Sequence, residues 1–147
     1  MNNINIYTLF LRTALATGFL SAVASRLSLW GKQSSGWSNF LSYTAQVNSF
    51  FPKSFIPTAA VASTLLETIL GILLFVGFKT RYAAFCAGYL TLLFAIAMAY
   101  SFGLKEILDY SVLAFSAGAF LLTTMPHYKY SIDQLLHNYS KEKLRKS

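Results

Sequence analysis

Long apolar runs, each about the length of a bilayer-spanning helix, dominate the pattern of hydrophobic and polar positions along the chain. A membrane core about 30 Å thick needs about 20 helical residues, because each residue rises ~1.5 Å along the axis. Lipid offers no partners for backbone N–H and C=O groups, so a segment that crosses it must be helical. We predict four transmembrane helices, over residues 4–24, 55–78, 82–102 and 107–125.

The connections between these segments differ in length. Residues 79–81 join the second and third helices, and residues 103–106 join the third and fourth, so these helices are expected to be antiparallel neighbours. The first connection, residues 26–54, is much longer, and apolar side chains recur in it at helical spacing. These apolar residues are Phe40, Tyr43, Val47, Phe50 and Phe51.

We predict an amphipathic helix in this first connection, lying in the membrane interface with Trp30 and Trp37 as anchors at headgroup level. A loop packed over the mouth of the bundle is the alternative. The predicted fold class is therefore all-α, an integral membrane bundle of four transmembrane helices with an interfacial amphipathic helix between the first and second crossings.

Composition and charge agree with a membrane protein. Hydrophobic residues make up 55% of the chain and charged residues only 12%. The net charge of +7 would suit nucleic acid, but the basic residues lie between and after the apolar runs, so we expect the lipid bilayer as partner and no nucleic acid. The N-terminus, the second connection and the tail share a side and carry most of the Lys and Arg, which predicts that both ends are cytoplasmic.

After Pro126 the sequence becomes polar and basic, which predicts a four-pass membrane domain over residues 1–126 and a cytoplasmic amphipathic tail over residues 127–147. Ser131 and Gln134 have the spacing of a capping box at the start of a tail helix. The basic end of the tail suits an anionic leaflet, and a merely solvated tail is the alternative.

Cysteine and histidine positions exclude several chemistries. The single cysteine, Cys86, cannot form an internal disulfide or a reactive dithiol, and we expect it to be a buried structural thiol. His127 and His137 both follow the fourth segment, so they cannot hold a haem within the membrane. No Cys/His spacing suggests a metal site, and no cofactor is evident from the residues alone.

Two charged residues lie inside predicted helices, Arg12 in the first and Glu67 in the second. Each isolated charge at mid-membrane costs roughly 2.5–3.5 kcal/mol on the insertion scale, so such residues persist when they pair or face a cavity. Counted from the cytoplasmic ends of the two helices, their depths differ by about 4–5 Å, which an arginine side chain can span. We therefore predict an Arg12–Glu67 ion pair.

Polar neighbours of this pair complete a candidate binding site. Ser63 precedes Glu67 by one turn on a face of small residues, and Thr13 and Thr17 begin a polar line beside Arg12. Together these five residues are predicted to line a narrow cleft between the first two helices. The alternative is that the ion pair only fixes helix register.

Asp109 lies near the predicted start of the fourth helix, where a carboxylate is stabilised by capping and by the helix dipole. We expect a capping role for it in preference to a catalytic one. It remains a secondary candidate for the binding site.

The chain resembles the DoxX family of small bacterial membrane proteins over residues 4–123. The resemblance is carried by the four-pass layout, by Arg12, by the Glu- and Gly-containing stretch 67–81, and by the Asp-Tyr-Ser sequence at 109–111. Residues 19–40 resemble a subgroup with a long first connection.

Within that subgroup, Arg26, Trp37 and Asn39 become further candidates. The subgroup is expected to have Asp and Gly where this chain has Ser25 and Ser28. Without that acidic neighbour, Arg26 is expected to be a snorkelling anchor at the outer membrane boundary.

The resemblance implies a location in the bacterial inner membrane and a link to redox chemistry. Relatives of the DoxD type form the membrane subunit of a thiosulfate:quinone oxidoreductase, and others are associated with oxidative-stress complexes. Our leading hypothesis is a subunit that binds quinone, with Arg12 on a carbonyl oxygen, in support of a soluble or membrane redox partner.

Two further functions stay open. The first is a small-solute transporter or channel, which would require a homo-oligomer because four short helices leave little room for alternating access. The second is a non-catalytic scaffold. Whether the protein is an enzyme is left open by the sequence.

Overall fold

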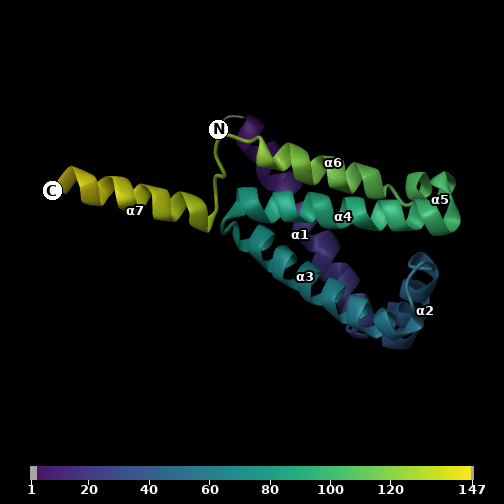
Figure 1. Ribbon diagram of the computed structural model, residues 1–147. Helices are drawn as coiled ribbons and strands as arrows, with labels where there is room; N and C mark the ends of the chain where they lie inside the picture. The colour runs from purple at the N-terminus through teal and green to yellow at the C-terminus, as the bar shows by residue number, and fades with distance from the viewer. Residues whose placement is uncertain (1–2, 147) are drawn as a thin grey trace.

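The computed structural model describes residues 3–146, and this part of the chain is all-helical, as the sequence predicts. Figure 1 shows the elements in order. They are α1 (Asn3–Arg26), the short 3-10 helix η1 (Gly31–Gln33), α2 (Trp37–Val47), a second 3-10 helix η2 (Lys53–Phe55), α3 (Ile56–Val76), α4 (Thr80–Phe102), α5 (Leu104–Asp109), α6 (Val112–Thr123) and α7 (Ile132–Lys146).

Within residues 3–146, three helical stretches are long and apolar enough to cross a bilayer: α1, η2 with α3, and α4. They have 24, 24 and 23 residues, or ~35 Å each. The predicted helices over residues 4–24, 55–78 and 82–102 are therefore confirmed as helices of spanning length.

The predicted fourth helix, over residues 107–125, is wrong as a single element. α5 ends at Asp109 and α6 begins at Val112, because Ser111 between them takes a left-handed φ of 54°, which a right-handed helix cannot continue. α6 has 12 residues and extends ~18 Å, which is less than the thickness of a bilayer core. Asp109 forms an ion pair with Lys105 one turn earlier on α5, so its expected capping role at a fourth helix is also wrong.

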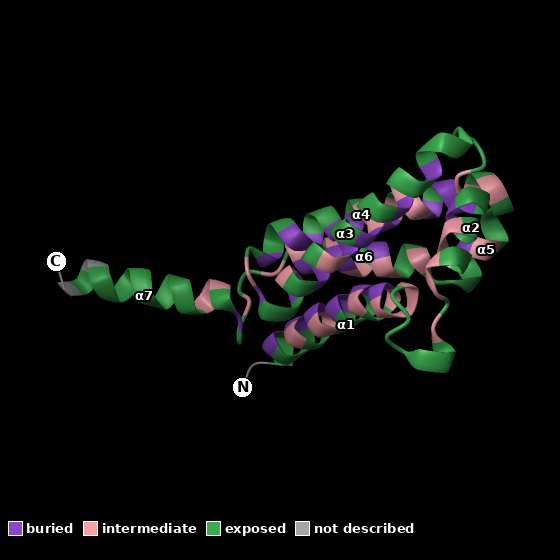
Figure 2. Ribbon diagram, turned by 90° about the horizontal axis from the view of Figure 1, so that it is seen from below, coloured by how far each residue is buried: buried purple, intermediate pink, exposed green. Residues whose placement is uncertain are grey.

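The three spanning helices and the shorter α6 associate as two closely packed pairs, α1 with α3 and α4 with α6. In Figure 1 the pairs meet where α3 turns into α4 and separate toward α2 and α5. We call the first of these the tail end, since α1 begins there and α7 starts there, and the second the cap end. In Figures 1 and 2 α7 extends away from the tail end of the bundle.

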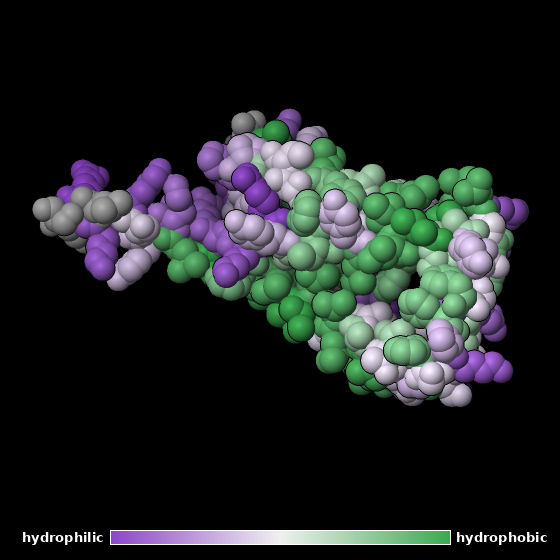
Figure 3. Space-filling view, in the orientation of Figure 1, coloured by the Kyte–Doolittle hydropathy of each residue, from purple (hydrophilic) through white to green (hydrophobic). Residues whose placement is uncertain are grey.

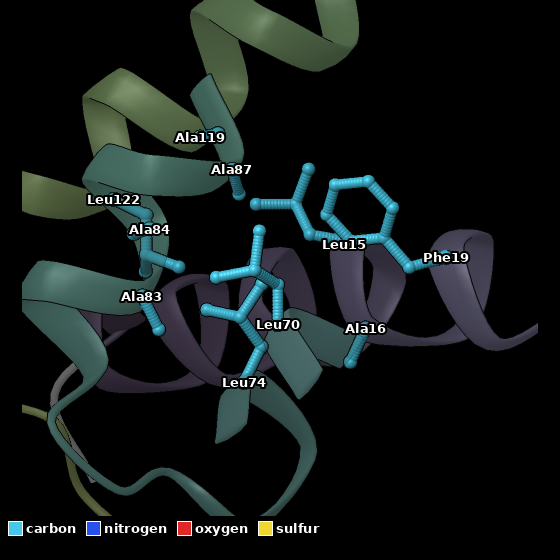
Figure 4. Packing of buried hydrophobic residues seen from close by; sticks show 10 residues of the cluster. All are labelled: Leu15, Ala16, Phe19, Leu70, Leu74, Ala83, Ala84, Ala87, Ala119 and Leu122. Carbon is cyan, nitrogen blue, oxygen red and sulfur yellow. The ribbon is translucent and has the colours of Figure 1, made fainter. Parts of the chain in front are cut away.

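Alanines make up half of the buried core near the tail end, beside leucines and Phe19, and many large apolar side chains are exposed on the outside. Ala84, Ala87 and Ala119 are fully buried in the core near the tail end (Figure 4), whereas Phe10 is 73% exposed and Leu93 is 61% exposed. This is the reverse of a water-soluble fold and is typical of helices that pack closely inside lipid. Figure 3 shows the resulting hydrophobic surface over the bundle, with hydrophilic residues gathered on α7.

Gly88 allows the close approach of α4 and α6. A Cβ at this position would lie 2.8 Å from the Phe120 ring, and the Gly88 carbonyl accepts a hydrogen bond of 2.9 Å from Ser116 Oγ. Cys86 lies two residues earlier on the exposed side of α4, so its expected burial is wrong.

The helix predicted in the long first connection exists as α2, and its placement in a membrane interface stays a prediction. α2 packs against both α3 and α4 at the cap end. Ser101 Oγ on α4 donates a hydrogen bond of 2.6 Å to the Val47 carbonyl, and the rings of Tyr43 and Phe102 stack with centroids 6.2 Å apart. These contacts hold α2 across the cap end of the bundle, next to the last turn of α1.

Candidate functional site

Two glycines, Gly71 in α3 and Gly77 directly after it, set the register between α1 and α3. A Cβ at Gly71 would lie 2.9 Å from Leu20, and a Cβ at Gly77 would overlap the Arg12 guanidinium. Arg12 is therefore level with the end of α3. Because the two helices are antiparallel, Glu67 is level with the last turns of α1, and it lies roughly 15 Å from Arg12 along the bundle axis.

An ion pair between Arg26 and Glu67 lies at this level. Arg26 Nη2 is 2.9 Å from Glu67 Oε2 and donates a hydrogen bond of 3.0 Å to Oε1. Arg26 Nη1 donates a hydrogen bond of 3.2 Å to Thr64 Oγ1. The Glu67 side chain is 2% exposed and that of Arg26 12%, so the charged pair is buried between α1 and α3.

An aromatic ring of α2 covers the guanidinium. Arg26 Cζ lies 3.9 Å from the centroid of the Phe40 ring, the geometry of a cation–π interaction. Trp37 packs against Phe40 with ring centroids 5.6 Å apart. Arg26, Glu67, Thr64 and Phe40 thus form one cluster from three helices, which we call the Arg26 site.

The loop before α2 is fixed to the end of α1 through Ser25. The Ser25 carbonyl accepts a hydrogen bond of 3.1 Å from the Gly36 N–H, and its hydroxyl accepts one of 3.0 Å from the Ser35 N–H. Asn39 Nδ2 donates to the Ser35 carbonyl at 2.8 Å. Ser25 and the candidate Asn39 therefore hold the loop before α2 in place, and the candidate Trp37 packs within α2 against Phe40.

The predicted Arg12–Glu67 ion pair is wrong. Arg12 and Glu67 would lie at similar depths only if α1 and α3 ended at the same level. At the tail end, however, α1 extends past the end of α3. Arg26, expected to be a snorkelling anchor, is the actual partner, because α2 closes over it and its charge turns inward. A signal for this was available: Phe40 recurs on the apolar face of the predicted interfacial helix, where it can pack on a cation.

The other predicted site residues do not gather around Glu67. The Thr13 and Thr17 hydroxyls donate to carbonyls of their own helix, Leu9 and Thr13 respectively, and Thr17 is exposed. Ser63 is half-buried, and its hydroxyl donates to the Ala60 carbonyl at 3.0 Å.

Arg12 instead joins the bundle to the segment that precedes α7. The residue is 3% exposed, and Nη2 donates a hydrogen bond of 2.7 Å to the Tyr130 carbonyl. Among the described residues, Arg12 Nε and Nη1 have no hydrogen-bond partner. The negative charge of Asp133 acts on the guanidinium from the same end of the molecule.

Asp133, in the first turn of α7, closes the turn between α3 and α4. Its carboxylate accepts hydrogen bonds from the backbone N–H of Lys79 at 2.7 Å and of Thr80 at 2.8 Å. Its own N–H donates to the Gly77 carbonyl at 3.0 Å. A carboxylate is favoured here because the first N–H groups of α4 have no partners within their own helix. We call these contacts the tail junction.

The start of α7 is capped as the sequence predicts. Ser131 Oγ accepts a hydrogen bond of 3.2 Å from the Gln134 N–H, which confirms the first half of the predicted capping box. Ile132, Leu135 and Tyr139 on α7 are exposed.

Replacing Asp133 with asparagine is expected to destabilise the protein by about 1 kcal/mol, within the 0.5–2 kcal/mol range of capping substitutions. The amide removes the negative charge and one of two acceptors at the start of α4. Thermal unfolding of the purified protein measures the loss, and limited proteolysis is expected to cut the segment before α7 faster. The matched control is Asp109→Asn, which neutralises an exposed aspartate on α5. Equal behaviour of the two variants would contradict a role for the tail junction.

The apolar exterior, the three helices of spanning length and a charged pair buried between two of them define a helical membrane protein. The DoxX family model matches residues 7–101, and the chain belongs to this family. The matched region runs from α1 to the end of α4, so it includes both residues of the ion pair. No curated protein and no solved structure matches the chain.

Proposed function

We propose that the protein is a membrane subunit that binds a quinone, or another lipid-soluble molecule with a polar head, at the Arg26 site in support of a redox partner. The observation that carries this proposal is the burial of Arg26 and Glu67 between membrane-spanning helices, at 12% and 2% exposure. Charged side chains inside a membrane domain are expensive, and they typically mark ligand or proton sites.

The chemistry of the Arg26 site suits a ring that carries carbonyl groups. A guanidinium presents five N–H donors in a planar fork, and a quinone carbonyl is an acceptor. Glu67 and Thr64 hold the guanidinium in place through the bonds of 3.0 and 3.2 Å described above. Phe40, whose ring lies 3.9 Å from the guanidinium carbon, adds aromatic surface to the site. In this proposal Arg26 takes the carbonyl-binding role that the sequence suggested for Arg12.

The proposal assigns electron transfer to a partner protein. The chain has one cysteine and therefore no dithiol of its own. With the tail end in the cytoplasm of a bacterial inner membrane, the Arg26 site lies in the outer half of the bilayer. A partner that exchanges electrons with the bound molecule would then approach the cap end.

The test has two parts. Ubiquinone and menaquinone analogues are added to protein purified in detergent, and binding is measured by thermal shift. Separately, the lipid that co-purifies with the protein is analysed for quinone. We expect a saturable rise in the unfolding temperature, since a ligand that binds only the folded state stabilises it. Replacing both charges in Arg26→Gln/Glu67→Gln is expected to weaken binding about 10- to 100-fold, the range for a hydrogen bond to a charged donor.

The double substitution leaves a neutral amide pair, so no unpaired charge stays buried in the variant. Arg81→Gln is the matched control, because Arg81 is exposed at the tail end and donates to the Met125 carbonyl. If no quinone co-purifies and added analogues leave the unfolding temperature unchanged, the proposal fails. Binding that is equal in the double variant and in the control would place the ligand elsewhere.

A further inference from the structure

A cavity lined largely by polar residues lies between the start of α7 and the segment that follows α6. Its volume is about 490 Å³, and its lining includes both histidines of the chain, His127 and His137, together with Lys129. His127 and Lys129 come from the segment before α7, and His137 lies in the second turn of α7. The fold thus brings together two imidazoles that the sequence separates by ten residues.

The donors around this cavity favour an anion. An imidazole offers an N–H in either protonation state and a lysine offers three N–H groups. The side-chain amides of Gln134 and Asn138 also line the cavity. The carboxylate in the lining, Asp133, already accepts two backbone N–H groups at the start of α4, which compensate part of its negative charge.

The positive charges near the cavity also favour an anion. Arg81 donates to the Met125 carbonyl at 3.2 Å, immediately before the segment that lines the cavity. Arg12 donates a hydrogen bond to the Tyr130 carbonyl of the same segment. A concave site that is open to solvent, with Lys129 in its lining and two arginines bonded to the adjoining backbone, favours anions.

We infer that this cavity binds a phosphate group, supplied either by the headgroup of an anionic lipid or by a soluble phosphate. Both sources present the same acceptor oxygens to His127, Lys129 and His137. Because the cavity lies at the tail end directly after α6, we expect it to face the headgroup region of the membrane. This site is separate from the Arg26 site, which lies toward the cap end.

The test uses the two histidines as reporters, in full-length protein with isotope-labelled imidazoles followed by NMR. In detergent, inorganic phosphate is titrated against chloride at equal ionic strength. In nanodiscs, phosphatidylglycerol is compared with phosphatidylcholine. We expect both imidazole signals to shift and to saturate together with phosphate, with phosphatidylglycerol, or with both, and these arms identify the source.

Lys129→Gln is expected to weaken phosphate binding about fivefold, as expected for one lysine acting on an anionic group near a membrane surface. Lys105→Gln, which changes an exposed lysine on α5 at the cap end, is expected to leave binding unchanged. Shifts that are equal in chloride, that never saturate, or that affect one imidazole alone would overturn the inference. So would the absence of any shift in all four conditions.

Discussion

Replacing Glu67 with leucine is expected to destabilise the protein by about 3–5 kcal/mol, the effect of removing one partner of a buried ion pair. Arg26 would keep its charge at 12% exposure while losing both of its bonds to the carboxylate. The loss of stability is measured by unfolding the purified protein in mixed micelles and monitoring its helix content. Glu106→Leu, at a half-buried glutamate on α5 outside the Arg26 site, serves as the control.

The double variant Arg26→Leu/Glu67→Leu separates two explanations of that loss. Because it leaves no unpaired charge, its stability is expected to return close to that of the unmodified protein. If the double variant were as unstable as Glu67→Leu alone, the unpaired guanidinium would not be the cause. A double variant that folds well but no longer binds quinone would favour the ligand site over a purely structural pair.

Replacing Gly77 with alanine is expected to destabilise the protein by roughly 2–4 kcal/mol, with contributions from backbone strain and from overpacking. Gly77 ends α3 in the left-handed conformation, with φ 70° and ψ 47°. A Cβ there would overlap both the Arg12 guanidinium and Ser131 Cβ, so the tail junction must shift. Thermal unfolding measures the total effect, and faster proteolysis before α7 reports the displaced junction.

Gly31→Ala isolates the backbone part of that effect. Gly31 also has a left-handed φ, of 58°, but no heavy atom lies within 4 Å of a Cβ placed there. This control is expected to cost about 1–2 kcal/mol, the penalty for a side chain in the left-handed region. Equal losses at Gly77 and Gly31 would contradict the close approach of α1, α3 and the tail.

Local patterns in the sequence were sufficient for most of the helices. Apolar runs of spanning length predict α1, α3 and α4, and the spacing of Phe40 and Val47 predicts α2. The Ser131 cap follows from residue types three positions apart. Each of these features depends on residues that are neighbours along the chain. Composition and spacing are therefore enough to predict these helices and the cap.

The features that the sequence did not predict depend on contacts between distant segments. The partner of Glu67 depends on how far α1 extends past α3, which counting from the end of an apolar run does not give. The break at Ser111 lies in a stretch without Gly or Pro, so nothing local marks it. Asp133 meets Lys79 across 54 residues, and its role at α4 has no signature in spacing.

The position of Asp133 has a consequence for biosynthesis. α3 and α4 can insert into a membrane as a hairpin once both have left the ribosome, but the carboxylate that closes their turn is made 54 residues after Lys79. Until Asp133 has been translated, the N–H groups of Lys79 and Thr80 therefore have only water or lipid headgroups as partners. Nascent chains arrested before Asp133 would carry an inserted hairpin with an open turn, and quality-control proteases could distinguish them from finished chains by that turn alone.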